Sequence, residues 1–316
     1  MKILVTGADG FVGSWLLPML TAEGHEVVAG LQPEVALAAQ AQRRGALEGA
    51  RSLPLELLDA ASIRSAIEMG WDAVVHLAAL ASGSEAQRNP LAAWEINTLG
   101  TVRVAEALGA LRSRGEDPLL LLVSTAEVYG AGTPDLRVET DPVRPCSPYA
   151  ASKLGAEIAA LEVHRRTGLR VVVARAFPHS GPRQDTRFVV PAFAQRLLDA
   201  KRSGAREIRV GDLSPVRDFL HVADVAGAYA RLLDKGRAGE VYNVASGRSV
   251  SVGDLLSMLA DVVGFPVTPV PGRELLRPVD IPHLVGDSTK LRTETGWQPA
   301  NSLEEMLRQV VDAQAN

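Results

Sequence analysis

The sequence predicts an α/β protein built on a doubly wound parallel sheet, with a smaller, irregular α/β region toward the carboxyl end. Short apolar, β-branched runs alternate with longer helical patterns in the first half, which is typical of repeated strand-helix-strand units. A glycine-rich turn directly follows the first run, and the regular alternation fades after about residue 176. Right-handed crossovers between such units place helices on both faces of one sheet.

The elements of the first half follow from these runs in chain order. Strands are expected at Lys2 to Thr6, Glu26 to Ala29, Ser52 to Leu55, Ala73 to His76, Leu119 to Val123 and Arg170 to Ala174. Helices are expected at Val12 to Ala22, Glu34 to Arg44, Ser62 to Met69, Pro90 to Leu111 and Pro148 to Arg166. We expect residues 1–175 to form one domain around this sheet.

The second half is less regular and includes a proline-rich stretch from Gly264 to Pro282. Helices are expected at Val189 to Lys201, Val222 to Asp234, Val252 to Val263 and Leu303 to Ala313, and short strands at Ile208 to Val210 and Val241 to Val244. We expect residues 176–316 to form a substrate-binding region, with 218–245 returning to the first domain. Ligands of open α/β sheets bind beyond the carboxyl ends of the strands, so the site is expected between the two regions.

Composition narrows the class of function. The 316 residues are 47% hydrophobic and 22% charged, with a formal net charge of −4, so there is no basic surplus for a nucleic acid or an anionic membrane. Cys146 is the single cysteine and no cysteine or histidine set has zinc spacing, which favours a reducing compartment and no metal. No apolar run resembles a signal peptide or a membrane span, so a cytoplasmic protein acting on small molecules is expected.

The turn after the first strand has glycines at three-residue spacing, Gly7, Gly10 and Gly13, with Phe11 and Val12 between the last two. Without side chains, the backbone can approach a pyrophosphate, and the helix N-terminus offers it free N–H groups and a partial positive charge. The position of the motif at the head of a strand-helix series predicts dinucleotide binding. The alternative is a tight turn alone.

A second motif is Tyr149 and Lys153, which lie four residues apart on a predicted helix and therefore share one face. A free tyrosine has a pKa of about 10, and lowering it by three units needs about 4 kcal/mol of preferential stabilisation of the phenolate. Lys153 and a cationic nicotinamide ring are suited to this, so the tyrosine could exchange a proton with a carbinol or carbonyl oxygen. Alone, such a pair is also a common exposed helical pair.

The order of the motifs carries more weight than any one of them. The glycine turn, His76-Leu77-Ala78-Ala79, Asn97, the segment Ser124 to Gly130, Tyr149 and Lys153 together resemble the extended short-chain dehydrogenase/reductase family over essentially the entire chain. The resemblance implies an NAD(P)-binding Rossmann domain in which Leu77, Ala78 and Ala79 also contact the cofactor. It implies that Thr125 binds the substrate oxygen, Tyr149 is the acid/base, Lys153 holds the ribose and lowers the tyrosine pKa, and Asn97 supports the site.

Asp59 follows the third strand and matches the position that binds adenine in this family. It could equally be the N-cap of the helix that follows, and both roles can hold. The second strand ends in Gly30-Leu31-Gln32-Pro33, with neither an acid for a ribose 2′-OH nor an adjacent arginine for a 2′-phosphate. NAD and NADP therefore both stay open.

Segments of the second half resemble the nucleotide-sugar branch of the family, most of all the GDP-mannose 4,6-dehydratases and GDP-4-keto-6-deoxy-D-mannose reductases. These segments contain His179, Phe188, Val189, Arg217, Asn243 and Arg277. The resemblance implies that they contact the nucleotide sugar, with Arg217 and Arg277 on its diphosphate. The chain has Pro178 where the branch usually has asparagine, so one substrate hydrogen bond of the branch lacks its amide.

The two residues that follow Thr125 bear on whether the enzyme is a reductase or a dehydratase. Ala126 stands where nucleoside-diphosphoglucose dehydratases carry an acid, whereas Glu127 could be the base that a dehydratase needs at C5. The favoured function is reduction of GDP-4-keto-6-deoxy-D-mannose to GDP-D-rhamnose with NAD(P)H. A 4,6-dehydratase, a nucleotide-sugar epimerase and a nucleotide-sensing binding protein are the alternatives. The resemblance also implies a homodimer through a four-helix bundle formed by 90–111 and 148–166.

Overall fold

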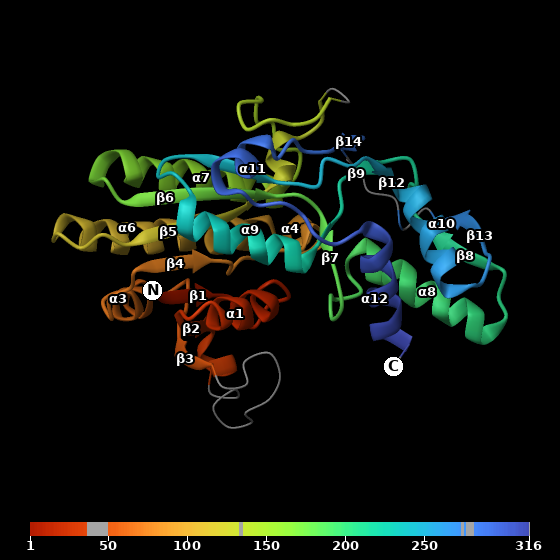
Figure 1. Cartoon of the computed structure of the whole chain (residues 1–316), viewed down its shortest axis with the longest axis horizontal. Coiled ribbons are helices and arrows are strands. Elements are labelled where there is room, and N and C mark those ends of the chain that lie inside the picture. Colours follow the sequence, from red (N-terminus) through yellow and green to blue (C-terminus); the bar gives the residue numbers. More distant parts are fainter. Residues whose placement is uncertain (37–49, 133–134, 273–274, 276–280, 316) are drawn as a thin grey trace.

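Figure 1 shows the chain as a computed structural model, in which residues 1–36, 50–132, 135–272, 275 and 281–315 are described. Seven parallel strands form the main sheet in the order β11-β6-β5-β4-β1-β2-β3. They are β1 (Lys2–Thr6), β2 (Glu26–Leu31), β3 (Arg51–Pro54), β4 (Ala73–His76), β5 (Leu119–Thr125), β6 (Arg170–Ala176) and β11 (Val241–Val244). The strand order runs outward from β1 in both directions, which confirms the doubly wound α/β fold.

Helices cover both faces of the sheet. One face packs against α1 (Gly13–Ala22), α9 (Val222–Lys235) and α11 (Thr289–Thr295). The other packs against α3 (Ala60–Ile67), α6 (Gly100–Ser113) and α7 (Pro148–Thr167). The central strands β1, β4 and β5 are buried on both sides, which explains their nearly continuous apolar sequences.

Local sequence fixes the ends of α7. The Ser147 hydroxyl accepts a hydrogen bond from the Ala150 N–H at 3.1 Å, and Pro148 occupies the first helical position. Gly168 ends the helix with φ 76°, a left-handed conformation that glycine adopts without strain. These two caps set the length of the helix that carries both Tyr149 and Lys153.

The helix expected at Pro90 to Leu111 is one continuous run with an interruption in its hydrogen-bonding pattern. It consists of α5 (Pro90–Ala93), the π-helical turn η2 (Trp94–Leu99) and α6, after the short α4 (Gly83–Arg88). A π-helical turn is wider than an α-helical one and occurs often at functional sites. This one contains Asn97, which is buried.

The second region has its own core and small sheets (Figure 1). Its helices α8 (Val189–Ser203), α10 (Val252–Val263) and α12 (Leu303–Ala315) pack against one another. The short strands are β7 (His179–Ser180), β8 (Glu207–Val210), β9 (Val216–Arg217), β10 (Leu220–His221), β12 (Val250–Ser251), β13 (Thr268–Pro271) and β14 (His283–Leu284). Outside this region, η3 (Ala126–Tyr129) is a short helical turn that directly follows β5. The proline-rich stretch thus contributes β13, which pairs with β8, to this region.

Each expected strand and helix has a counterpart in the structure to within a few residues, apart from one helix that can be compared only in part, whereas α4, α11 and most of the short strands of the second region were not expected. Residues 33–36 are helical, whereas the rest of the helix expected at Glu34 to Arg44 lies outside the described residues.

Within the described part of the chain, no helix is both long and apolar enough to cross a membrane. The same residues contain no group of three or more His, Cys, Asp or Glu side chains that could hold a metal ion.

Candidate active site

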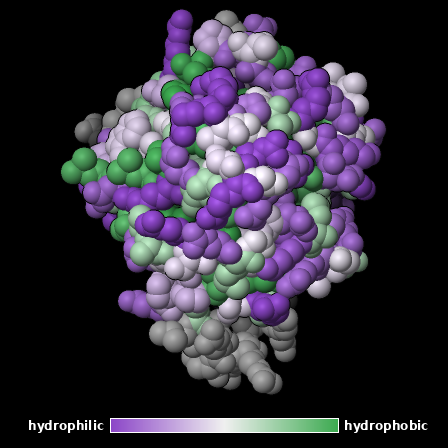
Figure 2. Space-filling model, turned by 90° about the vertical axis from the view of Figure 1, so that its left-hand side faces the viewer, coloured by the Kyte–Doolittle hydropathy of each residue, from purple (hydrophilic) through white to green (hydrophobic). Residues whose placement is uncertain are grey.

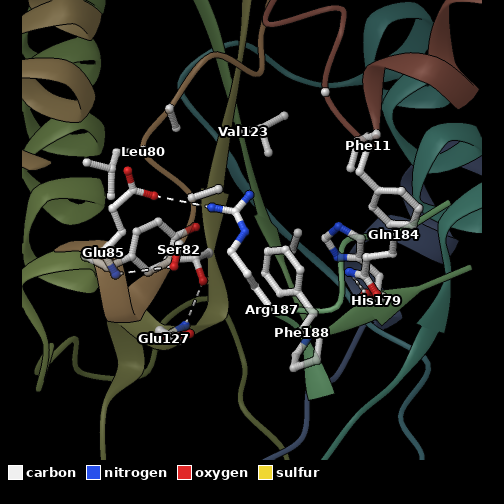
Figure 3. Close-up of a pocket in the computed structure, with 18 of the residues that line it drawn as sticks. Phe11, Leu80, Ser82, Glu85, Val123, Glu127, His179, Gln184, Arg187 and Phe188 are labelled. Atoms are coloured by element: carbon white, nitrogen blue, oxygen red, sulfur yellow. Dashed lines mark hydrogen bonds and ion pairs between the residues drawn. The ribbon is translucent and has the colours of Figure 1, made fainter. Parts of the chain in front are cut away.

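A cavity of about 960 Å³ lies where the carboxyl ends of the main strands face the second region. Ligand sites usually measure roughly 300 to 1,000 Å³, so this cavity lies at the upper end of that range. Of the residues predicted from the sequence, it is lined by Gly7, Gly10, Phe11, Val12, Leu77, Ala78, Ala79, Thr125, Ala126, Glu127, Tyr149, Lys153, His179, Phe188, Val189 and Arg217. Figure 3 shows Phe11 and His179 together on one side of the cavity, with Leu80, Ser82 and Glu85 on the other.

The glycine turn fits the close approach of a phosphate group. Gly7 has φ +65°, and a Cβ placed there would lie 2.7 Å from the Cα of Ala78. A Cβ on Gly13 would overlap the carbonyl oxygen of Ala8. Neither position accepts a side chain, and α1 begins here with no side-chain cap on its N–H groups. The turn therefore presents bare backbone and a helix N-terminus to the cavity.

The end of β4 is joined to the glycine turn by a buried polar contact. The Thr6 hydroxyl lies 2.8 Å from His76 Nδ1 and accepts a hydrogen bond from the Ala78 N–H at 3.3 Å. Burial, together with the nearby Lys153 ammonium, lowers the pKa of His76 to about 3. His76 is therefore neutral at pH 7, and this contact fixes the backbone of Leu77 and Ala78 in the cavity wall.

Asn97 holds two walls of the site together. Its Oδ1 accepts a hydrogen bond from the Leu80 N–H at 2.8 Å, and its Nδ2 donates to the Leu80 carbonyl at 3.2 Å and to the Ser152 hydroxyl at 2.9 Å. Asn97 does not line the cavity. It ties the segment after β4 to α7 beside Lys153, which is a positioning role.

Thr125, Glu127 and Tyr149 meet where β5 ends. The Thr125 hydroxyl caps η3 by accepting a hydrogen bond from the Glu127 N–H at 3.2 Å. Burial and the Glu127 carboxylate raise the pKa of Tyr149 above its ordinary value, and a hydrogen bond with Thr125 opposes them in part. The expected lowering of this pKa does not occur in the protein alone, because burial disfavours the phenolate.

Lys153 is buried on the same face of α7. Burial lowers its pKa to about 8, although the Glu157 carboxylate one turn further along acts to raise it. Glu157 in turn accepts hydrogen bonds from Arg175 and from the Ser124 hydroxyl. The lysine thus reaches the cavity above a buried polar network that joins α7 to β5 and β6.

The second region supplies the remaining wall. The His179 ring is stacked on the Phe11 ring, with centroids 6.3 Å apart and planes 5° apart, and its Nδ1 lies 2.9 Å from the Phe177 carbonyl. Burial lowers the pKa of His179. Arg217 Nη1 donates to the carbonyls of Val216 at 2.9 Å and Ile281 at 2.6 Å, which holds the guanidinium at the cavity wall.

Some predicted site residues do not line this cavity. Asp59 caps α3 by accepting a hydrogen bond from the Ala61 N–H at 2.8 Å, in agreement with the N-cap interpretation. Asn243 is fully buried, and its side chain is hydrogen-bonded to the Tyr129 hydroxyl and to the carbonyls of Arg137 and Asp287. The structure thus does not bring Asn243 to the cavity, and Arg277 lies outside the described residues.

The cavity also contains residues that the motifs did not indicate. Tyr229 of α9 lines it, as do Gln184, Glu85 and Arg187. Arg187 Nη1 lies 3.4 Å from Glu85 Oε2, so an ion pair joins the segment before α8 to α4 (Figure 3). Arg187 directly precedes Phe188, which the sequence analysis assigned to the sugar nucleotide, but its partner Glu85 is 102 residues away along the chain. No local pattern could have indicated this pair.

Comparisons with known proteins agree with this geometry. The sequence profile of the GDP-mannose 4,6-dehydratase family matches residues 4–310. The GDP-6-deoxy-D-mannose reductase of Pseudomonas aeruginosa is 35% identical over 98% of this chain and 96% of its own. The dTDP-glucose 4,6-dehydratase of Streptomyces griseus is 32% identical over 98% of this chain and 92% of its own.

Solved structures show the same relationship. The RMD protein of Pseudomonas aeruginosa in complex with NADPH has a TM-score of 0.82 and 32% identity, covering 99% of this chain and 97% of its own. UDP-glucose 4-epimerase of Thermus thermophilus in complex with NAD has a TM-score of 0.84 and 31% identity, covering 100% and 99%. The chain therefore belongs to the GDP-mannose 4,6-dehydratase family and is an enzyme of the extended short-chain dehydrogenase/reductase type.

Proposed function

We propose that the protein reduces the 4-keto group of a nucleotide-activated 6-deoxyhexose with NAD(P)H, converting GDP-4-keto-6-deoxy-D-mannose to GDP-D-rhamnose. The observation that carries this proposal is the meeting of Thr125, Tyr149 and Lys153 in one cavity that also contains the glycine turn. The similarity to a GDP-6-deoxy-D-mannose reductase supports the choice of substrate. In this proposal residues 1–175, with 218–245, hold the cofactor, and the other residues of 176–316 hold the sugar nucleotide.

The reaction needs an oriented carbonyl, a hydride and a proton. A reduced nicotinamide, when bound, would supply the hydride for C4 of the sugar and would itself be oxidised. Thr125 donates a hydrogen bond to the 4-keto oxygen, and Tyr149 gives its phenolic proton to that oxygen, which yields a secondary alcohol. The raised pKa of Tyr149 suits this direction, because the phenol keeps its proton at neutral pH until the oxygen becomes basic.

The cofactor would be held by the glycine turn and by Lys153. Gly7 and Gly10 admit the pyrophosphate, and Leu77, Ala78 and Ala79 bound the adjoining wall. Lys153, with a pKa of about 8, is largely charged at pH 7 and is suited to a ribose hydroxyl. At the adenine end, Gln32 lines the cavity after β2, and neither NAD nor NADP is favoured by its neutral side chain.

The sugar nucleotide would occupy the wall formed by the second region. Phe188 and Val189 offer apolar contacts, whereas His179 and Arg217 offer polar ones. A guanidinium is suited to a diphosphate because it is permanently charged and donates in a plane. Asn243 and Ala126 are buried, and we propose no polar contact of their side chains with the substrate.

A 4,6-dehydratase is the second candidate, because the carboxylate of Glu127 lines the cavity beside Tyr149. Such an enzyme must remove the C5 proton and protonate the departing C6 hydroxyl, and Ala126 offers no proton for the second step. Incubation with GDP-mannose separates the candidates. We expect no 4-keto product from GDP-mannose, and its formation with no net consumption of cofactor would replace the reductase with the dehydratase.

We also propose a homodimer formed by the helical run α5-η2-α6 and by α7. This run and α7 expose large apolar side chains, with Leu91 74%, Ile158 59% and Leu99 46% exposed. Figure 2 shows a mostly hydrophilic face with hydrophobic residues gathered toward its left-hand side. Two such helices and their symmetry mates would bury these side chains in a four-helix bundle.

A further inference from the structure

Tyr229 of α9 has a buried hydroxyl without a partner at the wall of the cavity. The residue is fully buried, and its phenolic oxygen has no hydrogen-bond partner among the described residues. Buried tyrosine hydroxyls usually have such a partner, and leaving one unpaired destabilises the folded protein because the hydroxyl loses its hydrogen bonds to water. Phenylalanine would fill the same core without this cost. The hydroxyl therefore needs an explanation beyond packing.

The position of Tyr229 points to the cavity for that explanation. Tyr229 is one of the residues that line the cavity. His76 Nε2 is also buried without a partner in the described part of the chain, but His76 does not line the cavity. α9, which carries Tyr229, packs against β5 and β6, and Tyr229 lines the cavity together with Val123 and Thr125 of β5 and with Tyr149. Burial is the main cause that raises the pKa of Tyr229, and the charge of Tyr149 adds to it. Tyr229 is thus at the reacting end of the cavity, close to the proposed acid.

The packing of Tyr229 distinguishes the cofactor side of the cavity from the sugar side. Its ring belongs to the core shared by α1, α9 and the main sheet, with Val123 of β5 packed against that core. The residues proposed for the sugar, such as Val189, pack against the separate core of the second region. The adenine end lies farther along the sheet, near Gln32 after β2.

We propose that the Tyr229 hydroxyl hydrogen-bonds the nicotinamide half of the bound cofactor, through the carboxamide that the ring carries. The inference rests on the cofactor binding of the proposed function. A carboxamide offers both a carbonyl acceptor and N–H donors, so it can pair a phenol in either sense. The bond would fix the rotation of the ring beside Tyr149. Tyr229 is a binding and positioning residue here, and no proton transfer is assigned to it.

The test is calorimetry of cofactor binding to full-length Tyr229→Phe, with the nicotinamide cofactor that the parent protein binds more tightly. We expect the dissociation constant to rise roughly 2- to 13-fold, the range for one neutral hydrogen bond. ADP-ribose, or its 2′-phosphate where NADPH is preferred, lacks the nicotinamide and should bind variant and parent equally. The melting temperature of the ligand-free variant should be unchanged or higher, because an unpaired buried hydroxyl has been removed.

Tyr242→Phe is the matched control. The Tyr242 hydroxyl is also buried, but it donates to Glu294 at 2.6 Å and accepts from the Arg237 N–H at 3.0 Å, away from the cavity. This variant should melt lower and bind the cofactor as the parent does. Equal cofactor affinity of Tyr229→Phe and parent, or an equal loss for ADP-ribose, would overturn the inference alone. A parent protein that binds neither NADH nor NADPH would overturn the proposed function with it.

Discussion

The guanidinium of Arg175 and the carboxylate of Glu157 form an ion pair 2.8 Å long beneath the candidate site, with side chains only 7% and 2% exposed. Arg175 lies on β6, and Glu157 lies on α7 one turn after Lys153. Glu157 also accepts a hydrogen bond from the hydroxyl of Ser124 on β5. The pair therefore fixes the helix that carries Tyr149 and Lys153 against the strands that end at the cavity.

Breaking this pair should destabilise the fold. Arg175→Met leaves the Glu157 carboxylate buried without its cation, and we expect unfolding in urea to show a loss of about 3 to 5 kcal/mol. Arg175→Met combined with Glu157→Leu removes both charges and should recover part of that loss. A single variant as stable as the parent would show that the pair does not hold α7.

Cofactor binding should weaken at alkaline pH. The folded protein loses the Lys153 charge as pH rises through about 8, whereas the unfolded chain keeps it to a higher pH because the ordinary pKa of lysine is 10.5. Affinity for the cofactor should therefore be full below pH 7 and fall above pH 8, while the Lys153 contribution to stability becomes more favourable between pH 8 and 10.5. Lys153→Met should bind weakly and without this pH dependence. The same pH profile in that variant would exclude Lys153 as its source.

The glycine turn can be tested with two alanine substitutions. Gly13→Ala places a methyl group against the Ala8 carbonyl, so we expect lower stability and loss of cofactor binding. Gly83→Ala, at the first position of α4, has no atom within 4 Å of its added Cβ and serves as the control. Thermal melting and calorimetry should show an effect only at Gly13. Equal effects would mean that the turn tolerates a side chain.

Sequence patterns predicted central strands such as β1, β4 and β5 well because these strands are almost entirely buried and therefore nearly all apolar. Predicted and observed bounds coincide for α10 and β11, whereas β5 continues through Ser124 and Thr125 beyond the apolar run. The π-helical turn around Asn97 was missed because one extra residue per turn hardly changes a helical pattern.

The site was predicted through motifs that match a known family, and this procedure has a physical limit. A motif reports the type of a residue and its place along the chain, but not its surroundings. Asn243 matched such a position, yet the carbonyls and the phenol that surround it use its amide in the core. Tyr229 belongs to no motif, and it lines the cavity on a helix, α9, that packs against β5 and β6.

Assembly can be tested with one charge on the exposed apolar face. Ile158→Glu puts a carboxylate where the proposed interface excludes water, so light scattering should show dimers giving way to monomers at micromolar concentration. Met69→Glu is the control, because Met69 is 50% exposed but follows α3, outside the proposed interface. A monomeric parent, or dimers of both variants, would rule out this interface.

The central claim is tested most directly by single turnovers of GDP-4-keto-6-deoxy-D-mannose with NADH or NADPH, followed by loss of the absorbance of the reduced nicotinamide. The parent should consume one equivalent of cofactor for each GDP-D-rhamnose formed, and Tyr149→Phe should bind cofactor normally but turn over at least about 100-fold more slowly. If the parent leaves the 4-keto sugar nucleotide unreduced, or if Tyr149→Phe turns over at the parent rate, the proposed reductase mechanism is wrong.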